Sequence, residues 1–103
     1  MNSERMANYL SLHGEGCLSS NEVANTVLYE LLSEPELDLA FLSSIGSLPA
    51  GVQEAFLDLL RRIRAADYQW RPFMIGSGPR PEYPDYPGKL QKICEFLEGL
   101  KRI

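Results

Sequence analysis

Three residues near the start of the chain could in principle form a nucleophilic site. His13 is the only histidine, and Glu15 and Cys17 follow it at intervals of two residues. A histidine next to a cysteine can act as the base that activates the thiol. No motif frames this trio, and no donors for an oxyanion can be identified around it. We therefore expect His13 to pack at the edge of the core, with an enzyme using His13 and Cys17 as an alternative.

The acidic residues do not predict a metal site. Glu30, Glu34, Glu36 and Asp38 gather around an expected helix junction, where carboxylates favour the positive end of a helix dipole. No HExxH, CxxC or EF-hand spacing occurs, and the prolines in GSGPRP exclude the helix that a phosphate-binding loop needs. The sequence therefore predicts a protein without catalytic function, metal or cofactor.

A short basic run contains Arg61, Arg62 and Arg64. Guanidinium groups bind phosphates and carboxylates in a forked geometry, so this run could contact nucleic acid or an acidic partner. The net charge of −4 and the lack of a recognisable reader motif argue against nucleic-acid binding. Asp58 and Asp67 are close enough in sequence to pair with the run. An ion-paired helix face is the simpler expectation, and a nucleic-acid-binding regulator is the alternative.

The most unusual segment is residues 67–88, which holds five of the seven prolines, three of the five tyrosines and the only tryptophan. So many prolines exclude a regular helix. Tyrosine, tryptophan and arginine are enriched at binding hot spots, and prolines reduce the entropy that a loop loses on binding. We predict a partner-binding edge made of Arg71, Arg80, Tyr83 and Tyr86.

Part of the same segment has a structural explanation. Trp70, Phe73 and Ile75 are expected to cover the end of the helical core and hold the loop in place. The prolines around Tyr83 and Tyr86 favour an extended and exposed backbone. That the whole loop is a structural plug remains the alternative.

Length and composition predict one globular domain. A chain of 103 residues with 45% hydrophobic residues can bury one core without disulfides. Two cysteines, Cys17 and Cys94, form no disulfide framework. No apolar run reaches the length of a membrane span, and the first residues do not resemble a signal peptide. We expect a cytoplasmic protein that does not enter a membrane.

Charge is distributed unevenly along the chain. Residues 1–60 contain nine acids and one base, whereas residues 61–103 contain nine bases and five acids. The two parts therefore carry charges of −8 and +4. This asymmetry is either neutralised within the fold or pairs the acidic part of one chain with the basic part of another.

Apolar residues recur at helical spacing nearly throughout, with no strand-like alternation of useful length. The first helix covers about residues 3–12 and ends at Gly14 and Gly16. Ser19 and Glu22 have the spacing of a capping box, which predicts the start of the second helix. The fourth begins near Pro49. The predicted buried stripes are Met6, Tyr9, Leu10 and His13 in the first helix, Val23, Val27 and Leu31 in the second, and Val52, Phe56, Leu59, Leu60 and Ile63 in the fourth.

The third and last helices complete the prediction. Ser33 and Glu36 repeat the capping-box spacing, with Pro35 in the first turn and Gly46 as a left-handed stop. The last helix follows Pro87. The expected stripes are Leu37, Phe41 and Ile45 in the third helix, and Leu90, Ile93, Cys94, Leu97 and Leu100 in the last. The result is an all-α, single-domain bundle of four or five helices, with an irregular loop at about residues 68–87.

Two helices are apolar on more than one side. Leu28 and Leu32 widen the apolar face of the second helix, and Leu39 and Leu42 that of the third. We expect these helices to form the central pair of the bundle, with a homodimer that covers the spare face as the alternative.

The function that these patterns favour is binding to another protein. An acidic helical domain without a catalytic set suits an adaptor, an inhibitor or an immunity-type partner.

Overall fold

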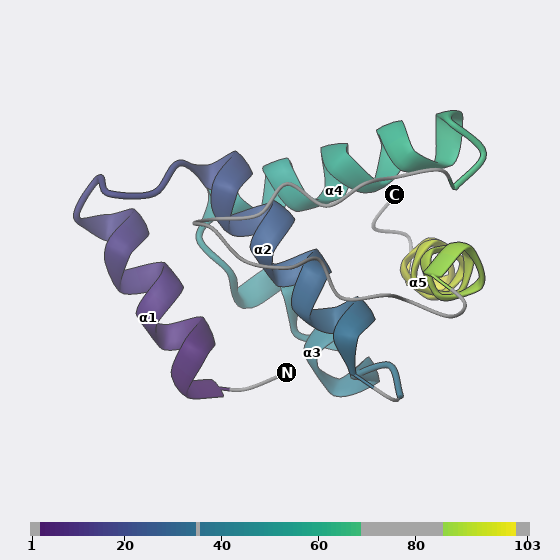
Figure 1. Cartoon of the computed structure of the whole chain (residues 1–103), viewed down its shortest axis with the longest axis horizontal. Coiled ribbons are helices and arrows are strands. Elements are labelled where there is room, and N and C mark those ends of the chain that lie inside the picture. Colours follow the sequence, from purple (N-terminus) through teal and green to yellow (C-terminus); the bar gives the residue numbers. More distant parts are fainter. Residues whose placement is uncertain (1–2, 35, 69–85, 101–103) are drawn as a thin grey trace.

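The chain folds into helices at almost every segment where apolar spacing predicts them. The computed structural model describes residues 3–34, 36–68 and 86–100, and Figure 1 shows their arrangement. Within these ranges there is no strand. The elements are α1 (Ser3–Gly14), α2 (Ser20–Ser33), α3 (Leu39–Ser43), the 3-10 helix η1 (Ile45–Ser47), α4 (Ala50–Ala65) and α5 (Tyr86–Gly99). The predicted all-α class is confirmed.

Helix α2 is the centre of a compact globule. It crosses the middle of the molecule, with α1 on one side and α4 behind it (Figure 1). Helix α5 is seen end-on near the C-terminal end of α2. The wide apolar face of α2 is covered within the chain, because Leu28 and Leu32 are both buried. The prediction of a central position is therefore confirmed for this helix. One core unites the helices, with the buried residues Val23, Val27, Leu31, Val52, Phe56, Leu60, Leu90, Ile93 and Leu97 at its centre.

The capping box at the start of α2 forms as predicted. The Glu22 backbone N–H donates to Ser19 Oγ at 3.1 Å, and the Ser19 N–H donates to the Glu22 carboxylate at 3.1 Å. The preceding turn is also the expected one: α1 ends at Gly14, and Gly16 has a φ of 79°. Glycine adopts this left-handed backbone without the steric cost of a side chain.

Helix α4 buries the whole stripe that its sequence predicts. Val52, Phe56, Leu59, Leu60 and Ile63 are all buried against the rest of the core. The helix approaches α2 closely at its first turn, where a Cβ atom on Gly51 would lie 2.9 Å from Ser20 Oγ. A side chain at residue 51 would therefore push the two helices apart or displace the serine.

The third helix differs from its prediction. Ser33 ends α2 and donates from its hydroxyl to the Tyr29 carbonyl, so it caps nothing. Asp38 is the actual N-cap, accepting the Phe41 N–H at 2.9 Å. A carboxylate later in the sequence thus takes the capping role and shortens α3 to five residues. Gly46 lies inside η1 without a positive φ, so the predicted left-handed stop is wrong, and Pro35 lies outside the described residues.

The short α3 is not a second central helix. Leu42 is fully buried, but Leu39 is 48% exposed. A five-residue helix has too few turns to bury two faces, so only one side of it reaches the core. The prediction of a central pair is therefore wrong for this helix.

Helix α5 closes one end of the globule. Leu90, Ile93, Cys94 and Leu97 are buried as predicted. Leu100 is 42% exposed, because α5 ends at Gly99 and the apolar stripe ends one turn earlier than the spacing predicts. Tyr86 begins the helix, and Pro87 lies in the first turn, where a missing N–H costs no hydrogen bond.

Helix α4 ends in an unusual turn. Asp67 and Tyr68 have φ values of 57° and 62°, a backbone region that non-glycine residues seldom occupy. The Tyr68 N–H donates to the Ile63 carbonyl at 2.8 Å, and its ring packs partly buried against the core. These contacts hold the turn in place. The described helices include none with the length and apolarity that crossing a membrane requires.

Candidate functional site

The structure does not assemble the proposed cysteine–histidine pair. His13 Nε2 lies 2.9 Å from Ser20 Oγ, in a hydrogen bond that joins the end of α1 to the start of α2. Cys17 is exposed in the turn between them. In the part of the chain that the structure describes, no carboxylate contacts the imidazole, so the pair with Ser20 lacks the third group of a catalytic triad. His13 is half-buried at the edge of the core, as predicted.

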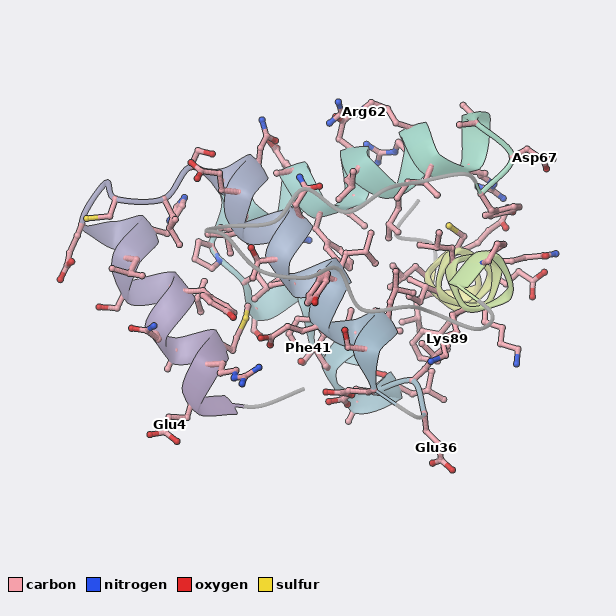
Figure 2. All side chains as sticks on the ribbon, viewed as in Figure 1. Glu4, Glu36, Phe41, Arg62, Asp67 and Lys89 are labelled. Atoms are coloured by element: carbon pink, nitrogen blue, oxygen red, sulfur yellow. The ribbon has the colours of Figure 1, made fainter. Side chains whose placement is uncertain are left out.

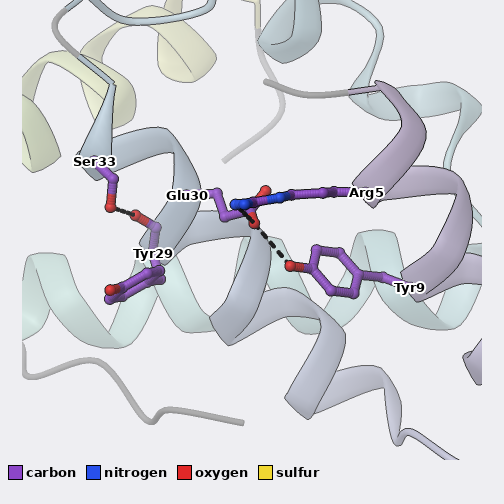
Figure 3. Close-up of polar contacts among 5 residues, drawn as sticks. All are labelled: Arg5, Tyr9, Tyr29, Glu30 and Ser33. Atoms are coloured by element: carbon purple, nitrogen blue, oxygen red, sulfur yellow. Dashed lines mark hydrogen bonds and ion pairs between the residues drawn. The ribbon is translucent and has the colours of Figure 1, made fainter. Parts of the chain in front are cut away.

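The buried carboxylate of Glu30 is the main polar feature that sequence reasoning missed. It lies on α2 and is held by two residues of α1 (Figure 3). Tyr9 donates its hydroxyl to Glu30 Oε1 at 2.7 Å, and Arg5 forms an ion pair with the same oxygen at 3.1 Å. The Glu30 side chain is only 10% exposed, whereas that of Arg5 is 67% exposed. The cluster satisfies a buried charge and fixes α1 on α2.

Tyr9 reports on this cluster through its pKa. Burial of the ring, the hydrogen bond to Glu30 and the charge of Glu30 together raise the pKa of Tyr9 to about 12. The folded state thus favours the protonated phenol more strongly than the unfolded chain does. This contribution to stability is complete below pH 10, the ordinary tyrosine pKa, and is lost as the pH rises towards 12.

We expect alkaline titration to reveal this interaction. Absorbance of the phenolate should show one tyrosine that ionises later than the others, and Tyr9→Phe should remove that late step. Between pH 10 and 12 the wild-type protein should lose more stability than Tyr9→Phe does, measured by urea unfolding. Equal losses in the two proteins would show that burial and the contact with Glu30 do not raise the pKa of Tyr9.

The basic run is largely paired within the chain. Arg62 contacts Asp58 at 2.9 Å along α4, which confirms the ion-paired face that the sequence favours. Arg64 contacts Glu98 of α5 at 2.6 Å, and this ion pair lowers the pKa of Glu98. Arg61 is exposed and has no ion-pair partner among the described residues. The three arginines therefore do not form one open cationic surface.

The predicted partner-binding edge cannot be placed. Arg71, Arg80 and Tyr83 lie outside the described residues, as does the side chain of Tyr86, although its backbone begins α5. The same is true of Trp70, Phe73 and Ile75. Their assignment remains a prediction from the sequence.

One open groove of the described chain lies between α3 and α5. This groove of about 510 Å³ runs between the turn before α3 on one wall and α5 on the other. Leu37 and Leu39 line the first wall and Phe96 lines the second. Leu100 follows Phe96 by one helical turn on the same side of the chain. We call Leu37, Leu39, Phe96 and Leu100 the α3–α5 strip.

The α3–α5 strip contains both of the large hydrophobic side chains that are most exposed in the described chain, Leu39 and Leu100. Leu39 lines the groove, and Leu100 lies one helical turn beyond Phe96, which lines its other wall. Single exposed leucines are common, but exposed apolar side chains around an apolar groove are typical of surfaces that bind other chains. The sequence pattern does not predict this patch, because Leu100 has the spacing of the buried α5 stripe and Leu39 is expected in a central, buried helix. Only the short α3 and the early end of α5 leave them uncovered.

Charged residues border the groove on both walls. Glu36 lies on the α3 wall and projects away from the body of the protein (Figure 2). Lys89 and Lys92 belong to α5 and line the opposite wall. Lys89 is bound to the end of α2: its Nζ donates to the carbonyls of Leu32 at 3.1 Å and Glu34 at 2.8 Å. A cation at the C-terminal end of α2 satisfies carbonyls that the helix leaves unpaired. Lys89 therefore fixes the position of the α5 wall.

A second groove lies between α1 and α3, with a volume of about 490 Å³. Met6, Leu10, Phe41 and Leu48 give it an apolar lining. The carboxylate of Asp38 and the hydroxyls of Ser44 and Ser47 also border it, but Asp38 accepts the Phe41 N–H and each hydroxyl donates to a carbonyl of its own segment. This groove therefore offers few free polar groups to orient a ligand.

The described residues contain no group of three or more histidine, cysteine, aspartate or glutamate side chains that could hold a metal ion. No protein-family model, curated protein or solved structure matches the chain.

Proposed function

We propose that this chain is a non-catalytic module that binds proteins, and that the α3–α5 strip is one of its binding surfaces. The observation that carries the proposal is the exposure of Leu39 in the groove and of Leu100 one helical turn beyond Phe96, which also lines the groove. Burial of apolar area is the main favourable term in protein association. A surface of this kind loses unfavourable contact with water when a partner covers it.

The polar side chains support the same proposal. His13, Glu30 and Lys89 each join two helices, and Arg64 joins α4 to α5. These groups hold the fold together and do not converge on one open cavity. The two cysteines are free thiols, one exposed and one buried, which fits a reducing cytoplasmic setting.

Affinity capture from the native lysate with matched variants tests the proposal. Tagged wild-type protein, Leu39→Glu and Asn8→Glu would be compared by quantitative mass spectrometry. Leu39→Glu places a charge in the α3–α5 strip, whereas Asn8→Glu adds the same charge to an exposed position on α1. We expect at least one protein to be captured by the wild type and Asn8→Glu, and its yield to fall at least about tenfold with Leu39→Glu.

Two outcomes would contradict the proposal. One is equal capture by all three proteins, which would place binding elsewhere. The other is the absence of any enriched protein, including untagged copies of the chain itself. Circular dichroism melts of the three proteins should coincide, because both substitutions fall on exposed positions.

A further inference from the structure

We propose that a second copy of this chain occupies the α3–α5 strip, forming a two-fold symmetric dimer. This inference rests on the proposed function, since it names the partner of the same surface. It is carried by the arrangement of charge across the groove. Glu36 borders one wall and Lys92 borders the other, and the apolar side chains of Leu37, Leu39 and Phe96 line the same groove.

A two-fold dimer requires a self-complementary surface. Both copies use the same patch. If one residue of the first copy contacts a different residue of the second, the reverse contact also forms across the axis. A two-fold axis along the groove brings the α3 wall of one protomer against the α5 wall of its partner. Glu36 of each copy then faces Lys92 of the other, and the opposite charges meet twice.

Both charges are available for this exchange. In the described residues, neither Glu36 nor Lys92 forms a hydrogen bond or an ion pair, although both border the same groove. Lys89 differs from them, because the carbonyls at the end of α2 hold its ammonium group. The cation that remains for a partner on this wall is therefore Lys92.

The apolar part of the surface fits the same symmetry. Leu39 projects from the α3 wall, while Phe96 and Leu100 follow Lys92 along one side of α5 at intervals of four residues. In the dimer, Leu39 of each copy meets the Phe96 and Leu100 side of the other. The interface thus has an apolar centre with a charged pair at each side, which is the usual anatomy of a protein interface.

The structure also argues against a dimer that uses the apolar face of α2. Leu28 and Leu32, which widen the apolar face of α2, are buried within the chain and offer nothing to a partner. Among the described residues, the large apolar side chains that remain exposed belong to α3 and to the end of α5.

Charge-reversal variants test the proposal with the purified full chain. Glu36→Lys alone places two lysines opposite each other at both ends of the interface, and Lys92→Glu alone does the same with two glutamates. We expect each single variant to dimerise at least about tenfold more weakly than the wild type, measured by sedimentation equilibrium. The double variant, with both charges reversed, should recover most of the wild-type association.

Mixing the two single variants gives the sharpest readout. In the mixed dimer, the lysine introduced by Glu36→Lys meets the glutamate introduced by Lys92→Glu. The native Lys92 of the first chain meets the native Glu36 of the second, so both contacts become attractive. We expect the mixture to dimerise more tightly than either variant by itself, and added salt to reduce the difference.

Charge reversals on another helix provide the matched controls. Glu54→Lys and Arg61→Glu change the same kinds of charge at exposed positions of α4 that do not line the groove. Both variants should dimerise as tightly as the wild type.

The possible failures are distinguishable. A wild-type protein that stays monomeric at all concentrations would overturn the dimer, as would charge reversals that change association no more than the α4 controls do. In either case, capture of a different protein through Leu39 would leave the proposed binding function intact. If a charge-reversal variant failed to fold, Glu36→Gln and Lys92→Gln would each be expected to weaken the dimer by a smaller factor.

Discussion

Phe56→Ala is expected to lower the free energy of unfolding by about 3–5 kcal/mol. The ring is fully buried at the middle of α4, where it packs into the core shared with α2. Its removal leaves a cavity that the surrounding helices fill only in part, so the lost transfer energy and the cavity both destabilise the fold. Urea unfolding monitored by circular dichroism measures the change.

Phe96→Ala is the matched control for this substitution. The Phe96 ring is only partly buried and lies at the edge of the groove, so the same chemical change should cost clearly less. Similar losses for Phe56→Ala and Phe96→Ala would contradict the burial described for the two rings.

A second pair of substitutions compares how much two leucines of α3 contribute to stability. Leu42→Ala is expected to cost about 2–5 kcal/mol, because Leu42 is fully buried. Leu39→Ala should change stability by no more than about 0.5 kcal/mol, since its side chain is 48% exposed. Thermal or urea unfolding of the two variants decides the matter, and equal losses would mean that α3 packs by a different face.

Local signals in the sequence account for much of the fold. Every residue of the predicted α4 stripe is buried, because sixteen helical residues let one apolar face repeat over several turns. The capping box of Ser19 and Glu22 is equally predictable, since it needs only residues three positions apart. Such features are decided within one helix and its adjacent turn.

Predictions failed where distant parts of the chain decide the outcome. Ser33 and Glu36 have the correct spacing for a cap, but burial of Leu31 and Leu32 extends α2 to Ser33, and Asp38 starts α3 instead. Spacing cannot show that Leu39 is 48% exposed. That requires knowing where α5 packs.

Glu30 illustrates the same limit for polar residues. In the sequence it is one of four acids around a helix junction, and spacing alone predicts a solvated position. In the structure it is buried because Arg5 and Tyr9, from a helix more than twenty residues away, supply its partners. Long-range pairing of this kind has no sequence signature within α2.

The most direct test of the central claim is photo-crosslinking from position 39 in living cells. A benzophenone side chain would replace Leu39 in one variant and Asn8 on α1 in a control. If the α3–α5 strip binds protein, irradiation should join the chain to a discrete protein from position 39 and not from position 8. The mass of the adduct would identify a second copy or a different partner. No protein adduct from position 39, or the same adducts from both positions, would contradict the account.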